Sequence, residues 1–194
     1  MDELAIFVNE MRGKNTLKDI ARTEQNLLYK CIRCKHCMSS SEYGPELEKF
    51  LKMHFQIDRA INNTSGDGHF QQKNIEIKVS LGDKEGTFSF VQIRPDHQVD
   101  FYLFLAYNLF EGNIGKIHLL LVPSDKIYEL LPQYATYAHG TVDVLGQINA
   151  QNIFGRNCEY ALRPNPNKNC NCKQRQLWDE LLKYEINWTQ SLNL

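Results

Sequence analysis

The segment from Asn74 to Ser80 constrains the fold of this chain more than any other, because its polarity alternates from residue to residue. Alternate side chains of a β-strand point to opposite faces of the sheet. The pattern therefore predicts a strand with an apolar face of Ile75, Ile77 and Val79 and a polar face of Glu76, Lys78 and Ser80. A buried sheet rarely places a carboxylate and an ammonium on one face without a reason.

The segments around this strand predict a mixed α/β fold. Gly82–Gly86 has the composition of a hairpin turn that would lead into a second strand at residues 87–94. Residues 96–109 are apolar nearly all round and predict a buried helix, whereas residues 116–122 predict a buried strand. Further helices are expected within residues 4–30, from Pro45, from Ser124 to Leu131, and within residues 179–184. The order predicts a central mixed β-sheet flanked by helices, with irregular C-terminal additions.

The length of 194 residues fits a single domain, residues 1–194. Within it we expect an N-terminal helical and Cys-rich part (residues 1–43), a catalytic core (44–131), and a C-terminal part (132–194) that carries DNA recognition.

The composition is that of an ordinary globular protein. A formal net charge of −1 gives no basic excess, which argues against a passive DNA binder. It argues less against a nuclease, because active-site carboxylates offset basic residues. No apolar run approaches the roughly 20 residues that span a bilayer, and the N-terminus lacks a signal-peptide pattern. We therefore expect a cytoplasmic protein with no membrane partner and with reduced cysteines.

The candidate catalytic residues are Asp67, Glu76 and Lys78. Asp67 lies between Gly66 and Gly68, where the backbone can approach closely, and precedes the alternating strand at short spacing. Two carboxylates with water and phosphate oxygens suit Mg²⁺, and the Ile77 carbonyl could supply another ligand. The ion would activate a water, and Lys78 would position or deprotonate it. The alternative is a Glu76–Lys78 salt bridge on a solvated strand face.

Asp67 followed by Glu76-Ile77-Lys78 resembles the signature of the PD-(D/E)xK nuclease superfamily, and more narrowly its type II restriction endonucleases. The resemblance covers residues 44–131 and implies a mixed sheet between helices and magnesium-dependent hydrolysis of double-stranded DNA. By position it implies that Asp67 and Glu76 bind the metal and that Lys78 is the catalytic lysine. It also implies a glutamate from the preceding helix, which is Glu48, with Glu46 as a rival. The chain departs from the signature at Gly66, where the family often has proline.

Two residues of the following strand, Gln92 and Arg94, are expected on one face. We expect them to reach the scissile phosphate or a water near the metal, Gln92 as a catalytic residue and Arg94 as a DNA contact. The alternative is that Arg94 pairs with a surface acid. His97 would begin the following helix, either as a phosphate contact or as an ordinary surface histidine.

The six cysteines suggest a zinc site. Three form a C-x₂-C-x₂-C pattern, and three more follow far downstream. A structural zinc site would take four ligands from Cys31, Cys34, Cys37, Cys158, Cys170 and Cys172. The alternative is that lone cysteines serve as small apolar core residues.

Residues 133–175 are rich in side chains that hydrogen-bond to bases and phosphates. The candidate DNA-binding residues there are Tyr134, Tyr137, His139, Arg156 and Arg163. The alternative is an irregular solvated surface.

The sequence thus predicts a sequence-specific double-stranded DNA endonuclease, a type II restriction enzyme that acts as a homodimer on a symmetric site. Two alternatives remain at this point. One is another nuclease of the same superfamily, acting in repair or nicking. The other is a non-catalytic, zinc-dependent DNA-binding module.

Overall fold

The computed structural model describes residues 16–138, 146–155, 157–167, 172–189 and 192. The chain divides into two compact units, Met1–Phe50 and Leu51–Leu194. The first unit contains α2 (Thr16–Thr23), α3 (Leu27–Cys37) and most of α4 (Ser40–Phe55). The last residues of α4, from Leu51, belong to the second unit, which carries all the strands.

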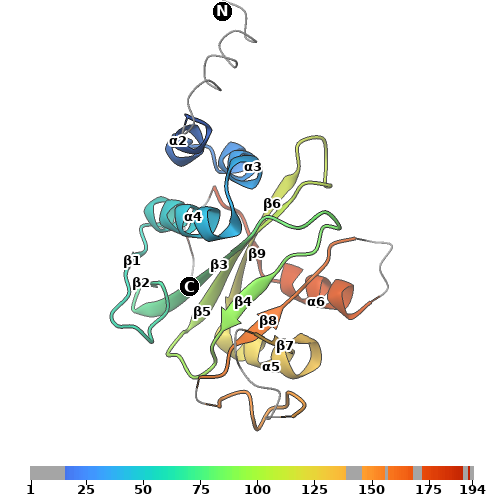
Figure 1. The fold of residues 1–194 in the computed structure, drawn as a ribbon. Coiled ribbons are helices and arrows are strands. Elements are labelled where there is room, and N and C mark those ends of the chain that lie inside the picture. The colour runs from blue at the N-terminus through green and yellow to red at the C-terminus, as the bar shows by residue number, and fades with distance from the viewer. Residues whose placement is uncertain (1–15, 139–145, 156, 168–171, 190–191, 193–194) are drawn as a thin grey trace, which may run out of the picture. The chain divides into compact units, whose positions relative to one another are not determined.

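The second unit is built on a six-stranded sheet with the order β1-β2-β3-β5-β6-β9 (Figure 1). These strands are β1 (Asp58–Arg59), β2 (Gly68–Phe70), β3 (Lys73–Ser80), β5 (Phe101–Asn108), β6 (Lys116–Pro123) and β9 (Glu185–Ile186). β3 and β5 are parallel, and the other neighbouring pairs are antiparallel. This mixed sheet confirms the predicted α/β class.

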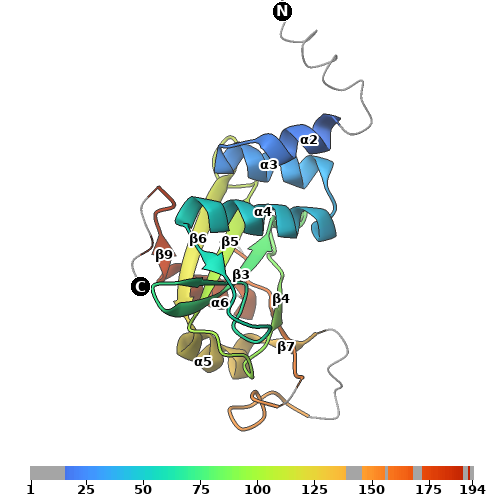
Figure 2. The same ribbon diagram turned by 90° about the vertical axis from the view of Figure 1, so that its left-hand side faces the viewer.

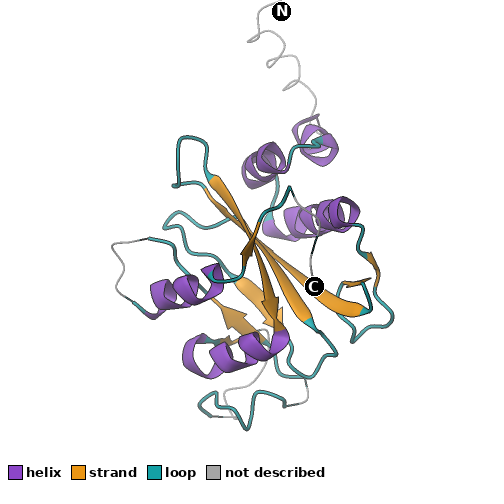
Figure 3. Cartoon of the chain, turned by 180° about the vertical axis from the view of Figure 1, so that it is seen from behind, coloured by secondary structure: helices purple, strands orange, loops and turns teal. Residues whose placement is uncertain are grey.

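A smaller antiparallel sheet and two helices cover one face of the large sheet. The small sheet has the order β4-β8-β7, formed by β4 (Phe90–Ile93), β8 (Tyr160–Leu162) and β7 (Thr136–Tyr137). The helices are α5 (Ser124–Tyr134) and α6 (Lys173–Leu182), seen from behind in Figure 3. They share one hydrophobic core with alternate residues of β5 and β6: Tyr102, Phe104, Ala106, Leu120 and Val122. Among the described residues, no helix combines the length and apolarity needed to cross a membrane.

The predicted helix at residues 96–109 is wrong, because this segment forms the central strand β5. Seven of its eight residues are buried. A strand that is covered on both faces reads as a continuous apolar run, and so does a buried helix. The predicted strand at 116–122 and the helix from Ser124 are confirmed as β6 and α5.

The predicted pairing of residues 74–80 with residues 87–94 in a hairpin is also wrong. A turn closed by the Asp83 N–H and the Thr87 carbonyl (2.9 Å) leads the chain away from β3. Phe88 then packs against Trp178 of α6, with ring centroids 5.1 Å apart. β4 therefore pairs with β8, Phe90 opposite Leu162 and Ile93 opposite Tyr160. Burial of bulky aromatic side chains decides the partner of this strand.

α4 begins at Ser40, five residues before the predicted start at Pro45. Glu42 accepts hydrogen bonds from the Ser39 N–H (3.0 Å) and the Ser39 hydroxyl (2.9 Å). This is the glutamate half of a capping box, which satisfies a backbone donor at the helix start. The Ser-rich segment at residues 39–41 is thus a helix start, and Pro45 lies inside the helix.

The first unit is fastened by a buried lysine. Lys30, only 2% exposed, donates to the carbonyls of Ala21 (3.0 Å) and Arg22 (2.7 Å) in the last turn of α2. The same ammonium donates to Glu46 on α4 at 3.1 Å. One side chain on α3 thereby links all three helices and satisfies carbonyls that a helix end leaves unpaired.

The β2–β3 hairpin has a two-residue loop of unusual composition. Gln71 and Gln72 have φ angles of +47° and +65°, which correspond to a type I′ turn between Phe70 and Lys73. Such turns favour Asn-Gly, because a left-handed backbone strains residues that carry a Cβ.

We expect Gln72→Gly to raise the free energy of unfolding by about 0.5–1 kcal/mol. Relief of the left-handed strain, about 1–2 kcal/mol, exceeds the entropic penalty of glycine, about 0.5–1 kcal/mol. Urea unfolding measures the change. Gln176→Gly, in the interior of α6, is the matched control and should lower stability by about 1 kcal/mol. Equal losses in both variants would contradict the turn assignment.

We expect Lys30→Met to lower the free energy of unfolding by about 1–3 kcal/mol, because two carbonyls and the Glu46 carboxylate lose their donor. Lys49→Met, at an exposed position of α4, is the control and should change stability little. If Lys30→Met had the same free energy of unfolding as the control, the hydrogen bonds of the Lys30 ammonium would not contribute to stability.

Candidate functional site

The structure brings together Glu76 and Lys78 of β3 and Asp67 of the loop before β2. Figure 2 shows the arrangement of β3 and its neighbouring strands. The Lys78 ammonium lies 2.5 Å from Glu76 Oε1. Asp67 Oδ2 accepts the backbone N–H of Ile77, the residue between them, at 2.8 Å. The three predicted catalytic side chains therefore form one cluster.

The backbone fixes the position of Asp67. Its N–H donates to the carbonyl of Ile75 at 2.9 Å, while its carboxylate binds the Ile77 N–H. In a strand, the N–H and the carbonyl of one residue project from the same edge. The Ile77 carbonyl therefore projects from the edge of β3 on which Asp67 lies, which is where the predicted metal ligand should be.

Gly66 is required by the local backbone. Its φ is +73°, and a Cβ at this position would lie 2.6 Å from the Ile75 carbonyl oxygen. Proline, with φ fixed near −65°, cannot adopt this conformation. The departure from the family signature thus follows from the way the chain folds over β3 just before Asp67.

Burial and neighbouring charges set the protonation of Glu76, which is 8% exposed. Burial raises the pKa of Glu76 most, the Lys78 ammonium lowers it, and the Asp67 carboxylate raises it again. The net direction is upward. Two carboxylates beside each other in a buried setting repel, and a bound cation would remove this repulsion.

Sequence reasoning missed two neighbours of Glu76. Tyr102 is fully buried opposite Glu76 in the β3–β5 register, and burial, Tyr128 and Glu76 raise its pKa. His97 lies close enough for its positive charge to lower the pKa of Glu76. Their proximity depends on β5 being a strand, so the predicted helix at 96–109 concealed it.

His97 lies on a turn that is tied to the site from two sides. Its N–H donates to the carbonyl of Arg94 at 3.1 Å, and the next N–H, of Gln98, donates to Thr64 at 2.7 Å. The Asn74 amide donates to the carbonyl of Gln98 at 2.7 Å. The turn is therefore held against both the loop before Asp67 and the start of β3, and no helix begins at His97.

Gln92 and Arg94 have different surroundings. Gln92 is exposed and has a φ of +57°, at the point where β4 bulges between Phe90 and Ile93. The Arg94 guanidinium binds Glu159 Oε1 through Nε (2.9 Å) and Nη2 (2.5 Å). This is the ion pair that the sequence left open as an alternative. Catalytic and DNA-binding roles for these two residues stay predictions.

The two glutamates considered from the preceding helix lie on α4 in the first unit. Glu46 binds the buried Lys30 ammonium, and Glu48 is half-buried. A catalytic role for Glu48 stays a prediction, whereas the structural contact of Glu46 is explained within its own unit.

The cysteines are distributed over both units. Cys31 and Cys34 are fully buried on the inner face of α3, and burial raises the pKa of the Cys34 thiol to about 11. Cys37 is half-buried, Cys158 is buried in the second unit, and Cys172 is disulfide-bonded rather than reduced. Cys170 lies outside the described residues. In the part of the chain that the structure describes, no three His, Cys, Asp or Glu side chains group to hold a metal, and the zinc site stays a prediction.

The predicted DNA-binding residues are only partly described. Tyr134 and Tyr137 pack against the hydrophobic core, Tyr137 with its ring 5.6 Å from that of Tyr160. Arg163 donates to the Thr136 hydroxyl. His139 and Arg156 lie outside the described residues. A DNA-reading role for this region stays a prediction.

Comparison with known proteins does not assign this chain to a family. No family model matches the chain, and neither the curated proteins nor the solved structures include a match. A functional interpretation therefore depends on the cluster of Asp67, Glu76 and Lys78 and on the resemblance of these residues to a nuclease signature.

Proposed function

We propose that this chain is a magnesium-dependent endonuclease that cleaves double-stranded DNA, in the manner of a type II restriction enzyme. One observation carries the proposal. Asp67, which stands ten residues before Ile77 in a loop, binds the backbone between Glu76 and Lys78, so both carboxylates and the ammonium converge on one strand. A symmetric DNA site would engage two copies of the chain as a homodimer.

The residues fit a hard divalent cation. Carboxylate and carbonyl oxygens are the ligands that Mg²⁺ takes from proteins, and here they would be Asp67, Glu76 and the Ile77 carbonyl. Burial raises the pKa of Glu76 most, and the Asp67 carboxylate raises it further. A bound cation would favour the ionised form of both carboxylates. When bound, the ion would make water more acidic and offset charge on the phosphate.

The protein's own groups have separate tasks in this proposal. Asp67 is held rigidly because Oδ2 accepts the Ile77 N–H, so Oδ1 is the oxygen for a cation. Glu76 holds the Lys78 ammonium in place at 2.5 Å. As an ammonium, Lys78 then orients the attacking water and offsets phosphate charge; it would accept a proton from that water only in its neutral form, after losing a proton of its own. His97, whose charge acts on Glu76, is a candidate phosphate contact of the same site.

We expect Lys78→Ala to reduce DNA cleavage by roughly 100- to 10,000-fold, the usual effect of losing a positioned acid–base group, while DNA binding persists. The assay is digestion of several long phage DNAs with Mg²⁺, with sequencing of the fragment ends. Lys126→Ala, an exposed lysine on α5, is the control for charge and should cut normally.

The wild-type protein decides the nuclease proposal in the same assay. Failure to cut any of the DNAs with Mg²⁺ would reject it and favour the non-catalytic DNA-binding alternative. Single-strand nicks or scattered ends would favour a repair or nicking nuclease. A constant end sequence would favour restriction.

We expect Mg²⁺ to raise the thermal stability of the wild-type protein without any DNA present. An ion that binds only the folded state contributes about 2.7 kcal/mol at about 100 times its dissociation constant. Asp67→Asn and Glu76→Gln should lose this effect, because each removes a charged ligand. Glu129→Gln, on the surface of α5, should retain it. An equal shift in all four proteins would show that the ion binds elsewhere.

A further inference from the structure

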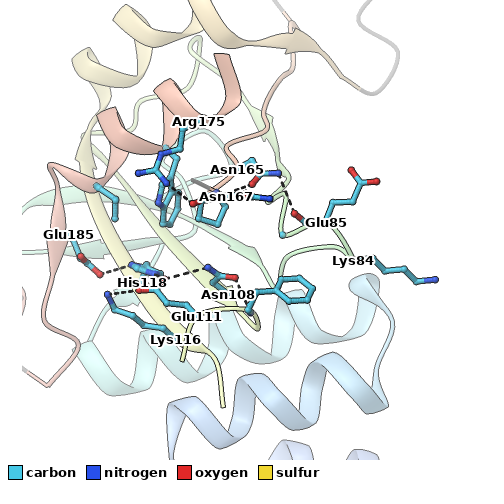
Figure 4. A pocket seen from close by; sticks show the side chains of 15 residues that line it. Lys84, Glu85, Asn108, Glu111, Lys116, His118, Asn165, Asn167, Arg175 and Glu185 are labelled. Carbon is cyan, nitrogen blue, oxygen red and sulfur yellow. Dashed lines mark hydrogen bonds and ion pairs between the residues drawn. The ribbon is translucent and has the colours of Figure 1, made fainter. Parts of the chain in front are cut away.

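A cavity of about 710 Å³ lies in the second unit, apart from the carboxylate cluster (Figure 4). Its walls come from six segments: the turn at residues 84–86, the end of β5 with the following loop, the start of β6, residues 165–167, α6 and β9. Asn108, Phe110, Trp178 and Arg175 are among its lining residues. None of the candidate nuclease residues lines it.

A buried histidine forms part of the cavity wall between two glutamates. His118 on β6 is 3% exposed. Its Nδ1 lies 2.8 Å from Glu185 Oε1 and its Nε2 lies 2.9 Å from Glu111 Oε2. The ring also meets Trp178 edge-on, with centroids 5.0 Å apart. Both nitrogens of one imidazole therefore face carboxylate oxygens.

The positions of the two carboxylates determine how many protons the His118 imidazole must carry. An ionised carboxylate only accepts hydrogen bonds, and a neutral imidazole donates from one nitrogen alone. Two ionised glutamates can both be satisfied only by the imidazolium form of His118. Loss of one proton leaves one buried nitrogen facing an acceptor, with no hydrogen bond between them.

The three residues lie on three different segments of the second unit. Glu111 lies in the β5–β6 loop, His118 in β6 and Glu185 in the two-residue edge strand β9. β9 pairs with β6 only at Leu119 and Leu120. One more hydrogen bond, from the Leu121 N–H to the Tyr184 carbonyl (3.0 Å), fastens the segment before β9.

Other charged and polar groups around His118 are engaged locally. Lys116 lies 3.1 Å from Glu111 Oε1, and the Asn108 amide lies 3.4 Å from Glu111 Oε2. Arg175, across the cavity on α6, binds Asp179 and the Pro166 carbonyl. Lys84 and Glu85 line the cavity from the turn at residues 84–86.

We propose that Glu111, His118 and Glu185 form a pH-sensitive latch that holds the β5–β6 loop and β9 against β6, and so keeps two walls of the cavity together. The latch is closed while His118 carries two protons and both glutamates are ionised. Rising pH opens it by removing the imidazolium proton. The inference is independent of the proposed nuclease activity.

Acid opens the latch by a different route. Partial burial raises the pKa of Glu111, but hydrogen bonds from His118 and Lys116 lower it, and the net direction is downward. The contribution of Glu111 is therefore present above its unfolded pKa and is lost as the pH falls through its lower folded pKa. Protonation of Glu111 at low pH therefore weakens the latch from the acid side.

Glu185→Gln tests the latch without removing the histidine. A glutamine amide can donate to the unprotonated nitrogen of a neutral imidazole, so this variant satisfies His118 without its second proton. Urea unfolding of the full chain is followed from about pH 5 to about pH 9, a range that spans the titration of imidazole groups. As the pH rises, the wild type should lose stability relative to Glu185→Gln. Glu180→Gln, which breaks a surface pair with Lys183, should follow the wild type.

Nuclear magnetic resonance of ¹⁵N-labelled histidine provides the second measurement, with His118→Gln to assign the signal. Both ring nitrogens of His118 should be protonated where the wild type is most stable relative to Glu185→Gln. Amide exchange protection at Leu121 should fall when one proton is lost. Parallel stability curves for wild type and Glu185→Gln, or a singly protonated ring at the pH of greatest relative stability, would overturn the latch.

Discussion

The parallel pairing of β3 with β5 is the constraint on which both polar sites of the second unit depend. Its register places Glu76 beside Tyr102, Lys78 beside Phe104 and Ser80 beside Ala106. In the antiparallel pairing of β5 with β6, Tyr102 lies opposite Val122, Phe104 opposite Leu120 and Ala106 opposite His118. Because residues directly opposite each other share a face, Glu76, Lys78 and His118 all project toward the same hydrophobic core. The carboxylate cluster and the latch are therefore two polar sites at different places on the sheet face that carries the hydrophobic core.

The Glu76–Lys78 pair is poorly explained as a stabilising contact. Its side chains are 11% and 14% exposed, so both charges have lost most of their hydration. Attraction between buried ions often fails to repay that loss, and apolar residues of similar volume are often as stable or more so. Asp67 adds a second carboxylate and further repulsion. A chain selected for stability alone would have little reason to keep this arrangement, and the proposed cation-dependent reaction would supply one.

Structure that local periodicity determines can be predicted from the sequence. Pairing between strands that are distant in the chain cannot. The alternation at residues 74–80 predicts β3 and the shared face of Glu76 and Lys78, and Gly66 already suggested a close approach before Asp67. The continuous apolar run at residues 101–108 has no such signature, so the helix prediction missed the central strand. β4 pairs with a strand much later in the chain, with Phe90 opposite Leu162, 72 residues away. The local sequence pattern around β4 does not indicate this partner. The cysteine spacing predicts zinc as readily as it predicts the inner face of α3, where Cys31 and Cys34 are buried.

The latch could not have been read from the sequence either, because Glu185 stands 67 residues from His118. Its position has a consequence for how the two sites communicate. His118 on β6 lies in register with Ser80 of β3, through Ala106 of β5. Ser80 is four residues after Glu76, about 13 Å at the rise of a strand. His118 is also two strands away from β3 across the sheet. Between them lie Phe104 and Leu120, packed apolar side chains that carry no charge. A proton lost at His118 therefore changes the cavity wall and the edge strand directly, but reaches the carboxylate cluster only through a rigid core. The pH dependence that the latch gives to folding stability and the pH dependence of any chemistry at Glu76 should accordingly arise at separate places within a single sheet.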